Sequence, residues 1–333
     1  MSDYSGVRVL VTGASGFLGS HVAERLVSEG AQVHAFIRDS SSTARLDHVA
    51  GSIVIHRGDV VDHASLLRCF RAASPEIVFH LAGDSTGRRS SGGWDAVDRS
   101  IAVNLAGTVN VLRAAAESGA GVRSVVRVGG LEEYGRCAIP FVEGDRELPV
   151  SSYSAAQVSA THFCQALQPD LTFQVVTARP ALVYGPRQAH RFFIPQLIES
   201  CLAGTDFDMT DGTQGRDLVY VSDVVNGLLI AAATPDLRGS VINLATGEEH
   251  ALFTVADHIV RMTRASIVVR KGARPTGHSD LQHLVGSTEH AARTLGWRSR
   301  IGLTDGLALT IEWHRDQLKS PRGRESAVAG TEQ

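Results

Sequence analysis

The sequence predicts an α/β protein in which a doubly wound parallel sheet is followed by a smaller α+β lobe. Short β-branched segments alternate with helix-like segments through the first half of the 333 residues. The strand segments are apolar along their whole length, which is typical of parallel strands buried on both faces. Beyond Pro180 this alternation gives way to loops, with Gly185 and Pro186 among them, and the change favours a separate lobe.

Each element follows from a local pattern. Apolar β-branched runs predict the strands, and helical periodicity of apolar residues predicts the helices. Strands are expected at 7–12, 32–37, 53–57, 77–82, 124–128 and 173–178, with 243–247 returning to the sheet. Helices are expected from a glycine-rich turn to about residue 30, and at 64–73, about 100–118 and 152–167.

Composition narrows the class of protein. Hydrophobic residues make up 43% and charged residues 20%, as in globular proteins with a sizeable core. A net charge of -3 without a basic block argues against nucleic-acid and membrane partners. The longest apolar stretch, 224–233, is too short to span a bilayer, and no signal peptide is visible, so we expect a cytoplasmic protein. The cysteines are scattered without a CxxC pair, so no metal site is expected.

The strongest motif is a glycine-rich turn directly after the first strand. Gly13, Gly16 and Gly19 lie between a predicted strand and a predicted helix, as a dinucleotide-binding turn requires. Gly13 permits the tight turn, Gly16 lets the backbone approach a pyrophosphate, and Gly19 allows close helix packing. The amides and dipole at the helix start favour a diphosphate. The residues expected to bind a nicotinamide cofactor here are Gly13, Ser15, Gly16, Phe17, Leu18 and Gly19.

The end of the second strand favours NADP(H) over NAD(H). An NAD site places an acidic residue there for the ribose 2′-hydroxyl, but that position is Ile37, and Arg38 follows it. A guanidinium suits a 2′-phosphate, and residues 40–42 add serine hydroxyls. NAD(H) is the alternative if Asp39 takes the acidic role. Further cofactor contacts are expected at Asp59, Val60, Leu81, Ala82 and Gly83, with helix capping as the alternative for Asp59.

A series of motifs in order resembles the extended short-chain dehydrogenase/reductase family, which includes sugar-nucleotide epimerases, dehydratases and ketoreductases. The resemblance covers about residues 7–315 and implies a Rossmann sheet, an NAD(P)-dependent enzyme and, as in many members, a homodimer. Beside the glycine turn and Asp59, it rests on 104–108, 134–135, Tyr153, 179–180, 184–186, 216–223 and 295–297. It adds cofactor contacts at Asn104, Pro180 and Val183.

The order and composition of the segments also predict a domain organisation. Residues 1–180 and about 217–247 are expected to form the dinucleotide-binding domain. The substrate-binding lobe is expected at about 181–216 and 248–318, and residues 319–333 are expected to form a flexible tail.

The catalytic set that the family implies is incomplete in this chain. Tyr153 stands at the tyrosine position, but the lysine position is Gln157 and the serine position is Gly130. Gln157 lies on the same helical face as Tyr153, so it keeps a role in positioning the cofactor ribose without a charge. A phenol without a neighbouring cation keeps its proton at neutral pH, so it donates a proton more readily than it removes one. This asymmetry favours carbonyl reduction over alcohol oxidation.

Other polar groups are candidates for the missing proton chemistry. Ser85 and Thr86 follow the fourth strand at the carboxyl edge where such sites open, with loop capping as the alternative. Glu132 aligns with a glutamate of sugar dehydratases, although its partner position is Leu131. Substrate contacts are expected at Gly130, Leu131, Leu182 and Arg216.

Leu182 and Arg216 bear on the nature of the substrate, and Asp223 bears on helix capping. By the resemblance, Leu182 replaces an asparagine common in sugar-nucleotide enzymes, which favours a less polar substrate. Arg216 is expected to contact either a phosphate or a carboxylate such as Asp217. Asp223 is expected to be the N-cap of the helix that follows it.

These residues favour an NADPH-dependent ketoreductase that reduces a ring carbonyl of a largely apolar small molecule, such as an aromatic polyketide. The lysine-poor composition, with only Lys271 and Lys319, is similar to that of proteins from GC-rich antibiotic producers. The chain also resembles antibiotic-pathway ketoreductases of the angucyclinone, simocyclinone type. Two alternatives stay open: a nucleotide-sugar epimerase, dehydratase or 4-ketoreductase, and a cofactor-binding pseudoenzyme without turnover.

Overall fold

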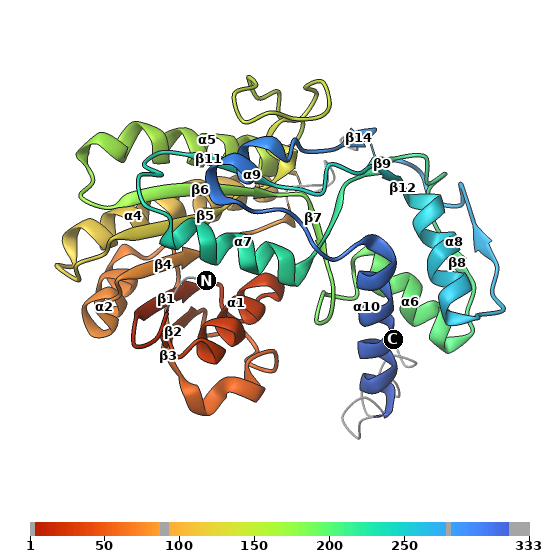
Figure 1. The fold of residues 1–333 in the computed structure, drawn as a ribbon, viewed down its shortest axis with the longest axis horizontal. Coiled ribbons are helices and arrows are strands. Elements are labelled where there is room, and N and C mark those ends of the chain that lie inside the picture. The colour runs from red at the N-terminus through yellow and green to blue at the C-terminus, as the bar shows by residue number, and fades with distance from the viewer. Residues whose placement is uncertain (1–3, 87–92, 278–280, 320–333) are drawn as a thin grey trace.

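The computed structural model describes residues 4–86, 93–277 and 281–319. The strands of its central parallel sheet are β1 (Arg8–Thr12), β2 (Gln32–Ile37), β3 (Ile53–Arg57), β4 (Ile77–His80), β5 (Ser124–Val128), β6 (Gln174–Pro180) and β11 (Val241–Leu244). These seven strands lie in the order β11-β6-β5-β4-β1-β2-β3 (Figure 1). The order reverses between β1 and β4, and a crevice therefore opens at their carboxyl ends. The predicted doubly wound Rossmann sheet is confirmed.

Helices cover both faces of the sheet because successive residues of each strand point to opposite faces. One face carries α1 (Phe17–Ser28) and α7 (Val221–Ala233), and the other carries α2 (His63–Ala73), α4 (Gly107–Glu117) and α5 (Ser152–Leu167) (Figure 1). In β1, Val9 and Val11 belong to the apolar cluster shared with α1 and α7. Leu10 belongs to the cluster shared with α2, α4 and α5. Each of the three is fully buried, so burial on both faces explains why these three successive residues are all apolar.

The helix predicted at about 100–118 has an irregular start. It follows α3 (Gly93–Arg99), passes through a π-helical segment at Ser100–Ala106 and continues as α4. Within the π-helical segment, Asn104 Oδ1 accepts a hydrogen bond from the Asp84 amide (2.8 Å), and Asn104 Nδ2 donates to the Asp84 carbonyl (2.9 Å). The irregular segment thus fixes the loop that follows β4 at the edge of the crevice, as such segments frequently do at functional sites.

After β6 the chain leaves the sheet and returns only at β11, which pairs with β6. Beyond the end of the sheet, α6 (Phe193–Ala203), α8 (Leu252–Thr263) and α10 (Leu303–Lys319) pack against one another (Figure 1). Short strands accompany them: β7 (Leu182–Tyr184), β8 (Phe207–Asp208), β9 (Gly215–Arg216), β10 (Leu218–Tyr220), β12 (His250–Ala251), β13 (Val269–Arg270) and β14 (His283–Leu284). The remaining elements are η1 (Asp47–Ser52), η5 (Leu131–Glu133), η6 (Gln168–Asp170) and α9 (Glu289–Leu295).

The domain boundaries stay a prediction. Residues 319–333 were predicted to form a flexible tail, and only Lys319 of this tail lies within the described residues. None of the helices in the described ranges is long and apolar enough to cross a membrane.

Two aspartates show how the segments around the crevice are held. The prediction that Asp223 is the N-cap of α7 is wrong: the N-cap is Tyr220, and Asp223 lies inside the first turn. Its carboxylate instead accepts hydrogen bonds from the amides of Arg300 and Ile301 (2.9 and 2.8 Å), which ties α7 to the segment before α10. The cap of α2 is Asp62. Asp59 is therefore not a helix cap, and its side chain lies at the crevice.

Candidate functional site

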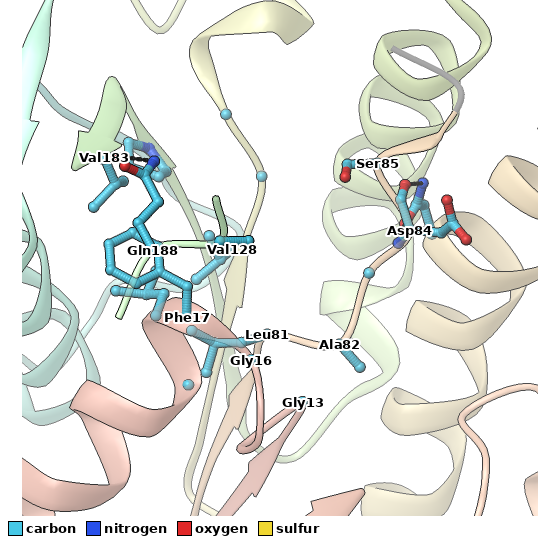
Figure 2. A pocket seen from close by; sticks show the side chains of 18 of the residues that line it. Gly13, Gly16, Phe17, Leu81, Ala82, Asp84, Ser85, Val128, Val183 and Gln188 are labelled. Atoms are coloured by element: carbon cyan, nitrogen blue, oxygen red, sulfur yellow. Dashed lines mark hydrogen bonds between the residues drawn. The ribbon is translucent and has the colours of Figure 1, made fainter. Parts of the chain in front are cut away.

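A cavity of about 700 Å³ opens at the carboxyl ends of the central strands. Figure 2 shows Phe17, Val183 and Gln188 on one side of it and Ala82, Asp84 and Ser85 on the other, with the glycine turn at its base. Nearly all the residues predicted for the site line this cavity. The exceptions are Thr86, which bonds to Asp84, and Leu131, which is fully buried in the core.

The glycine turn has a shape that fits a dinucleotide. Gly13 has a φ of 70°, and a Cβ there would come within 2.7 Å of the Ala82 amide nitrogen. A Cβ at Gly19 would overlap the Gly13 carbonyl oxygen. Helix α1 starts after Gly16 without a side-chain cap and without an acidic residue in its first turn. Because Ser15–Gly19 line the cavity, the unpaired amides of that turn suit a diphosphate.

The cavity becomes strongly cationic beyond the end of β2. This strand ends at Ile37, and Ile37 and Arg38 line the cavity, whereas Asp39 is exposed. Ser41, Ser42 and Arg45 also line it. Arg45 Nε donates to the Arg187 carbonyl (2.9 Å), and burial, with Arg187 and Arg191 nearby, lowers the pKa of Arg45. Sequence analysis missed Arg45, because no spacing rule links it to the strand.

The loop after β4 forms the opposite wall. Leu81, Ala82 and Gly83 line the cavity, as does Asn104, which holds Asp84 from behind. Ser85 Oγ accepts a hydrogen bond from Arg191 Nη2 (3.4 Å), so this loop contacts the segment that leads into α6. The hydroxyl and amide of Thr86 both donate to Asp84, which supports the loop-capping role for Thr86.

Tyr153 and Gln157 line the cavity from α5 and are 7% and 5% exposed. Gln157 does not stand alone there. Arg127, from β5, lines the same cavity, and its Nη2 donates to Gln157 Oε1 and to the Gln157 carbonyl (3.1 Å for the carbonyl). Sequence analysis missed Arg127, although a cation inside the apolar strand 124–128 was a visible signal.

Glu132 occupies the space that Gly130 leaves open. A Cβ at Gly130 would lie 2.7 Å from Glu132 Oε2, and both residues line the cavity. The carboxylate therefore lies close to where the hydroxyl of the family's serine would project from residue 130.

A buried ionic network lies behind these residues. Glu133 Oε2 accepts from Arg179 Nη2 (2.7 Å) and from the Thr161 hydroxyl (2.6 Å), and Glu133 Oε1 lies 3.7 Å from Arg127 Nη1. Arg179 also donates to Glu147 (2.7 Å). The network thus balances two guanidinium groups with two carboxylates. The two lysines lie elsewhere, Lys271 beside Asp257 and Lys319 beside Asp316.

The far end of the cavity is lined by residues from the part of the chain outside the sheet. Pro180, Leu182 and Val183 lead into it, and Arg216 lies on β9 at its end. Asp217 does not need Arg216 as a partner, because its buried carboxylate accepts hydrogen bonds from Thr246 and Gly247. The Arg216 guanidinium lines the same cavity as the glycine turn and suits a second anionic ligand.

A Rossmann sheet, a glycine turn and a tyrosine on α5 define an NAD(P)-dependent enzyme of the short-chain dehydrogenase/reductase type. The chain belongs to the NAD dependent epimerase/dehydratase family, whose model it matches over residues 9–245.

Similar proteins narrow this class. The UDP-glucose 4-epimerase of Mycolicibacterium smegmatis is 32% identical over 326 residues, which cover 93% of this chain and 99% of that protein. A crystal structure of the Thermotoga maritima UDP-glucose 4-epimerase with UDP-glucose has a TM-score of 0.85 and 25% identity, over 93% of this chain and 99% of that one. The Thermus thermophilus UDP-glucose 4-epimerase in complex with NAD has a TM-score of 0.83 and 27% identity, with the same coverage.

These similarities correct the function expected from the sequence. A ketoreductase for a largely apolar molecule is wrong, because the relatives act on nucleotide sugars. The expectation rested on Gly130 and Gln157 at two catalytic positions, together with the predicted preference for NADP(H) and Leu182. The structure shows Arg127, from β5, bonded to Gln157, and the Glu132 carboxylate beside Gly130.

Proposed function

We propose that the chain is a nucleotide-sugar epimerase that oxidises and then reduces one ring carbon of its substrate. One observation carries the proposal: a single cavity joins the glycine turn, Tyr153 and Arg216. It therefore brings together a cofactor site, a tyrosine and a cationic group that suits a second anion. The substrates named for the similar epimerases have a diphosphate that matches this cationic group.

Each part of the cavity has a separate role in this reaction. The amides after Gly16 hold the cofactor diphosphate, and the bound nicotinamide supplies a hydride acceptor and donor. In the oxidation step the Tyr153 phenolate takes the proton from the sugar hydroxyl while the hydride goes to the cofactor, and in the reduction step the resulting phenol returns that proton. Arg216 binds the substrate diphosphate, for which a planar guanidinium is well suited. Val183 and Phe17, on the same wall in Figure 2, exclude water from the reacting atoms.

Dehydration of a nucleotide sugar is the second candidate, and Glu132 favours it. Such a reaction needs a base for a carbon-bound proton in addition to the tyrosine, and Glu132 is a carboxylate on the cavity wall. The adjacent Leu131 is fully buried and supplies no acid.

We also propose NADP(H) as the cofactor that binds more tightly, although the similar Thermus protein is described with NAD. Arg38, Ser41, Ser42 and Arg45 line the adenosine end, and the strand-end position that an NAD site makes acidic is Ile37. Fluorescence titration with NADPH and NADH gives the order of affinity directly. Tighter binding of NADH would contradict this assignment.

One assay separates the two reactions. Purified protein with added NAD⁺ or NADP⁺ is incubated with UDP-glucose or dTDP-glucose, and products are identified by NMR and mass spectrometry. An epimer of unchanged mass supports the first proposal, and a keto sugar lighter by one water supports the second. Absence of either product across the nucleotide sugars, with cofactor binding intact, would overturn both. Tyr153→Phe is the matched inactive control.

A further inference from the structure

The position of the family's lysine is held by two residues in this protein. Gln157 and Arg127 both line the cavity, Gln157 from α5 and Arg127 from β5, and the Arg127 guanidinium bonds to the Gln157 carboxamide. Both side chains are at least 95% buried, since Arg127 is 1% and Gln157 5% exposed. A buried polar pair of this kind is costly unless each group is bonded, so its geometry is strongly determined.

Arg127 fixes the orientation of the Gln157 carboxamide. A guanidinium has donors and no acceptor, so only the amide oxygen can face it. Arg127 Nη2 donates to Gln157 Oε1, and this contact leaves the Nε2 amino group on the side away from the guanidinium. Gln157 lines the cavity, so it presents two N–H donors there.

Arg127 is itself held from three sides. Its Nη1 donates to Thr161 Oγ1 (2.9 Å), and its Nη2 donates to the Gln157 carbonyl (3.1 Å). Glu133 Oε1 lies 3.7 Å from Arg127 Nη1, and Glu133 is bound in turn to Arg179. Because each contact comes from a buried neighbour, the guanidinium cannot rotate away from the carboxamide without leaving polar groups unpaired.

We propose that Arg127 is a positioning residue which orients Gln157 so that its amide donates to the ribose hydroxyls next to the nicotinamide of the bound cofactor. The pair replaces the ribose-holding role of the family's lysine and adds no net charge, since the surrounding network is balanced. The inference rests on the cofactor site of the proposed function but not on the identity of the sugar.

Cofactor binding tests this without turnover. The dissociation constant of NADPH or NADH, whichever binds more tightly, is measured by fluorescence titration. Gln157→Leu removes the donors and Arg127→Met removes their orientation, so each is expected to weaken binding about tenfold. The affinity for ADP, which lacks the nicotinamide ribose, is expected to stay unchanged in both. Gln165→Leu is the matched control, because it makes the same substitution as Gln157→Leu at an exposed position of α5 outside the cavity, and it is expected to leave both affinities unchanged.

The variant Gln157→Lys, alone and combined with Arg127→Met, tests the pairing of the two side chains most directly. Gln157→Lys alone places an ammonium against the Arg127 guanidinium and is expected to weaken cofactor binding, because like charges are buried together. In the double variant Arg127→Met with Gln157→Lys the repulsion is gone, and the affinity is expected to return to within about threefold of the parent protein.

The opposite results would overturn the inference. In one such result, the losses of cofactor affinity in the two single variants simply add in the double variant. In another, the affinities for ADP and for the full cofactor fall equally. Either result would show that Arg127 only supports the fold. If Arg127→Met does not fold, Arg127→Lys replaces it and is expected to weaken binding by a smaller factor. Absence of nucleotide-sugar turnover in the parent protein, with this binding pattern intact, would count against the proposed function alone.

Discussion

Glycine at position 130 and glutamate at position 132 depend on each other. Because a Cβ at residue 130 would lie 2.7 Å from Glu132 Oε2, a serine at 130 would displace the carboxylate from its present place. The chain thus exchanges a neutral hydroxyl for a carboxylate at the cavity wall. A carboxylate accepts protons, which a serine hydroxyl does poorly.

Replacement of Glu132 tests this exchange. Glu132→Gln keeps the shape but removes the base, so turnover is expected to fall about 10²-fold while the cofactor dissociation constant stays unchanged. Steady-state kinetics and fluorescence titration give the two values. Glu248→Gln, at an exposed carboxylate, is the control. Unchanged turnover in Glu132→Gln would remove Glu132 from the chemistry.

Arg38 determines the preference between the two cofactors in our proposal. Arg38→Ala is expected to weaken NADPH binding about tenfold or more and to leave NADH binding nearly unchanged, since only NADPH has the 2′-phosphate. The preference is expected to decrease with salt, because Arg38 is exposed. Arg71→Ala, an exposed change on α2, is the control. Equal losses for both cofactors would place the contact elsewhere than the 2′-phosphate.

The sequence alone was sufficient to predict those helices and strands whose apolar residues follow a simple local pattern. The strands predicted at 32–37, 53–57 and 124–128 coincide with β2, β3 and β5, and the helix predicted at 152–167 coincides with α5. The π-helical break at Ser100–Ala106 and the short strands beyond β6 were not predictable, because they depend on contacts with distant segments.

The same limit applies to the site. The glycine turn is encoded within seven residues, so its lining residues followed from the sequence. Arg127 and Gln157 are 30 positions apart, and their contact depends on how β5 and α5 pack. No spacing rule within one element could have joined them.

Asp223 links α7 to the start of α10, and its removal is expected to weaken that link. Asp223→Ala leaves the part-buried amides of Arg300 and Ile301 without their charged acceptor, which is expected to cost about 1–3 kcal/mol in the free energy of unfolding. Asp223→Asn keeps an acceptor oxygen and is expected to cost less. Urea denaturation measures both, with Asp316→Ala at the surface as the control. Equal stability of the alanine variant and the parent would contradict the link.

The whole molecule is expected to lose stability in acid because of a buried histidine. His80 ends β4, is 2% exposed and bonds to the hydroxyls of Thr12 (2.7 Å) and Thr108 (3.2 Å). Burial, with a smaller effect of Arg127, lowers the pKa of His80 from 6.5 to about 3. Below pH 6.5 the unfolded chain therefore binds a proton that the folded chain does not bind until the pH approaches 3.

This difference sets the sign of the pH dependence. Stability falls as the pH is lowered from about 6.5, by up to about 1.4 kcal/mol per pH unit from His80. His80→Asn is expected to be less stable at neutral pH but to show a shallower decline in acid, measured by denaturation at several pH values. His283→Asn, at an exposed site, is expected to keep the parent's slope. An unchanged slope in His80→Asn would show that His80 is not the group responsible.

The late position of β11 in the chain has a consequence for biosynthesis. The edge of β6 gains its last partner only at Val241–Leu244, after the whole excursion through α6 and α7. While the ribosome is still making that excursion, the nascent chain carries an uncovered strand edge, which is a template for pairing with other chains. Fragments that stop before residue 241 are therefore expected to aggregate or to engage chaperones, and cutting the gene after β6 is not expected to yield the nucleotide-binding half as an independent unit.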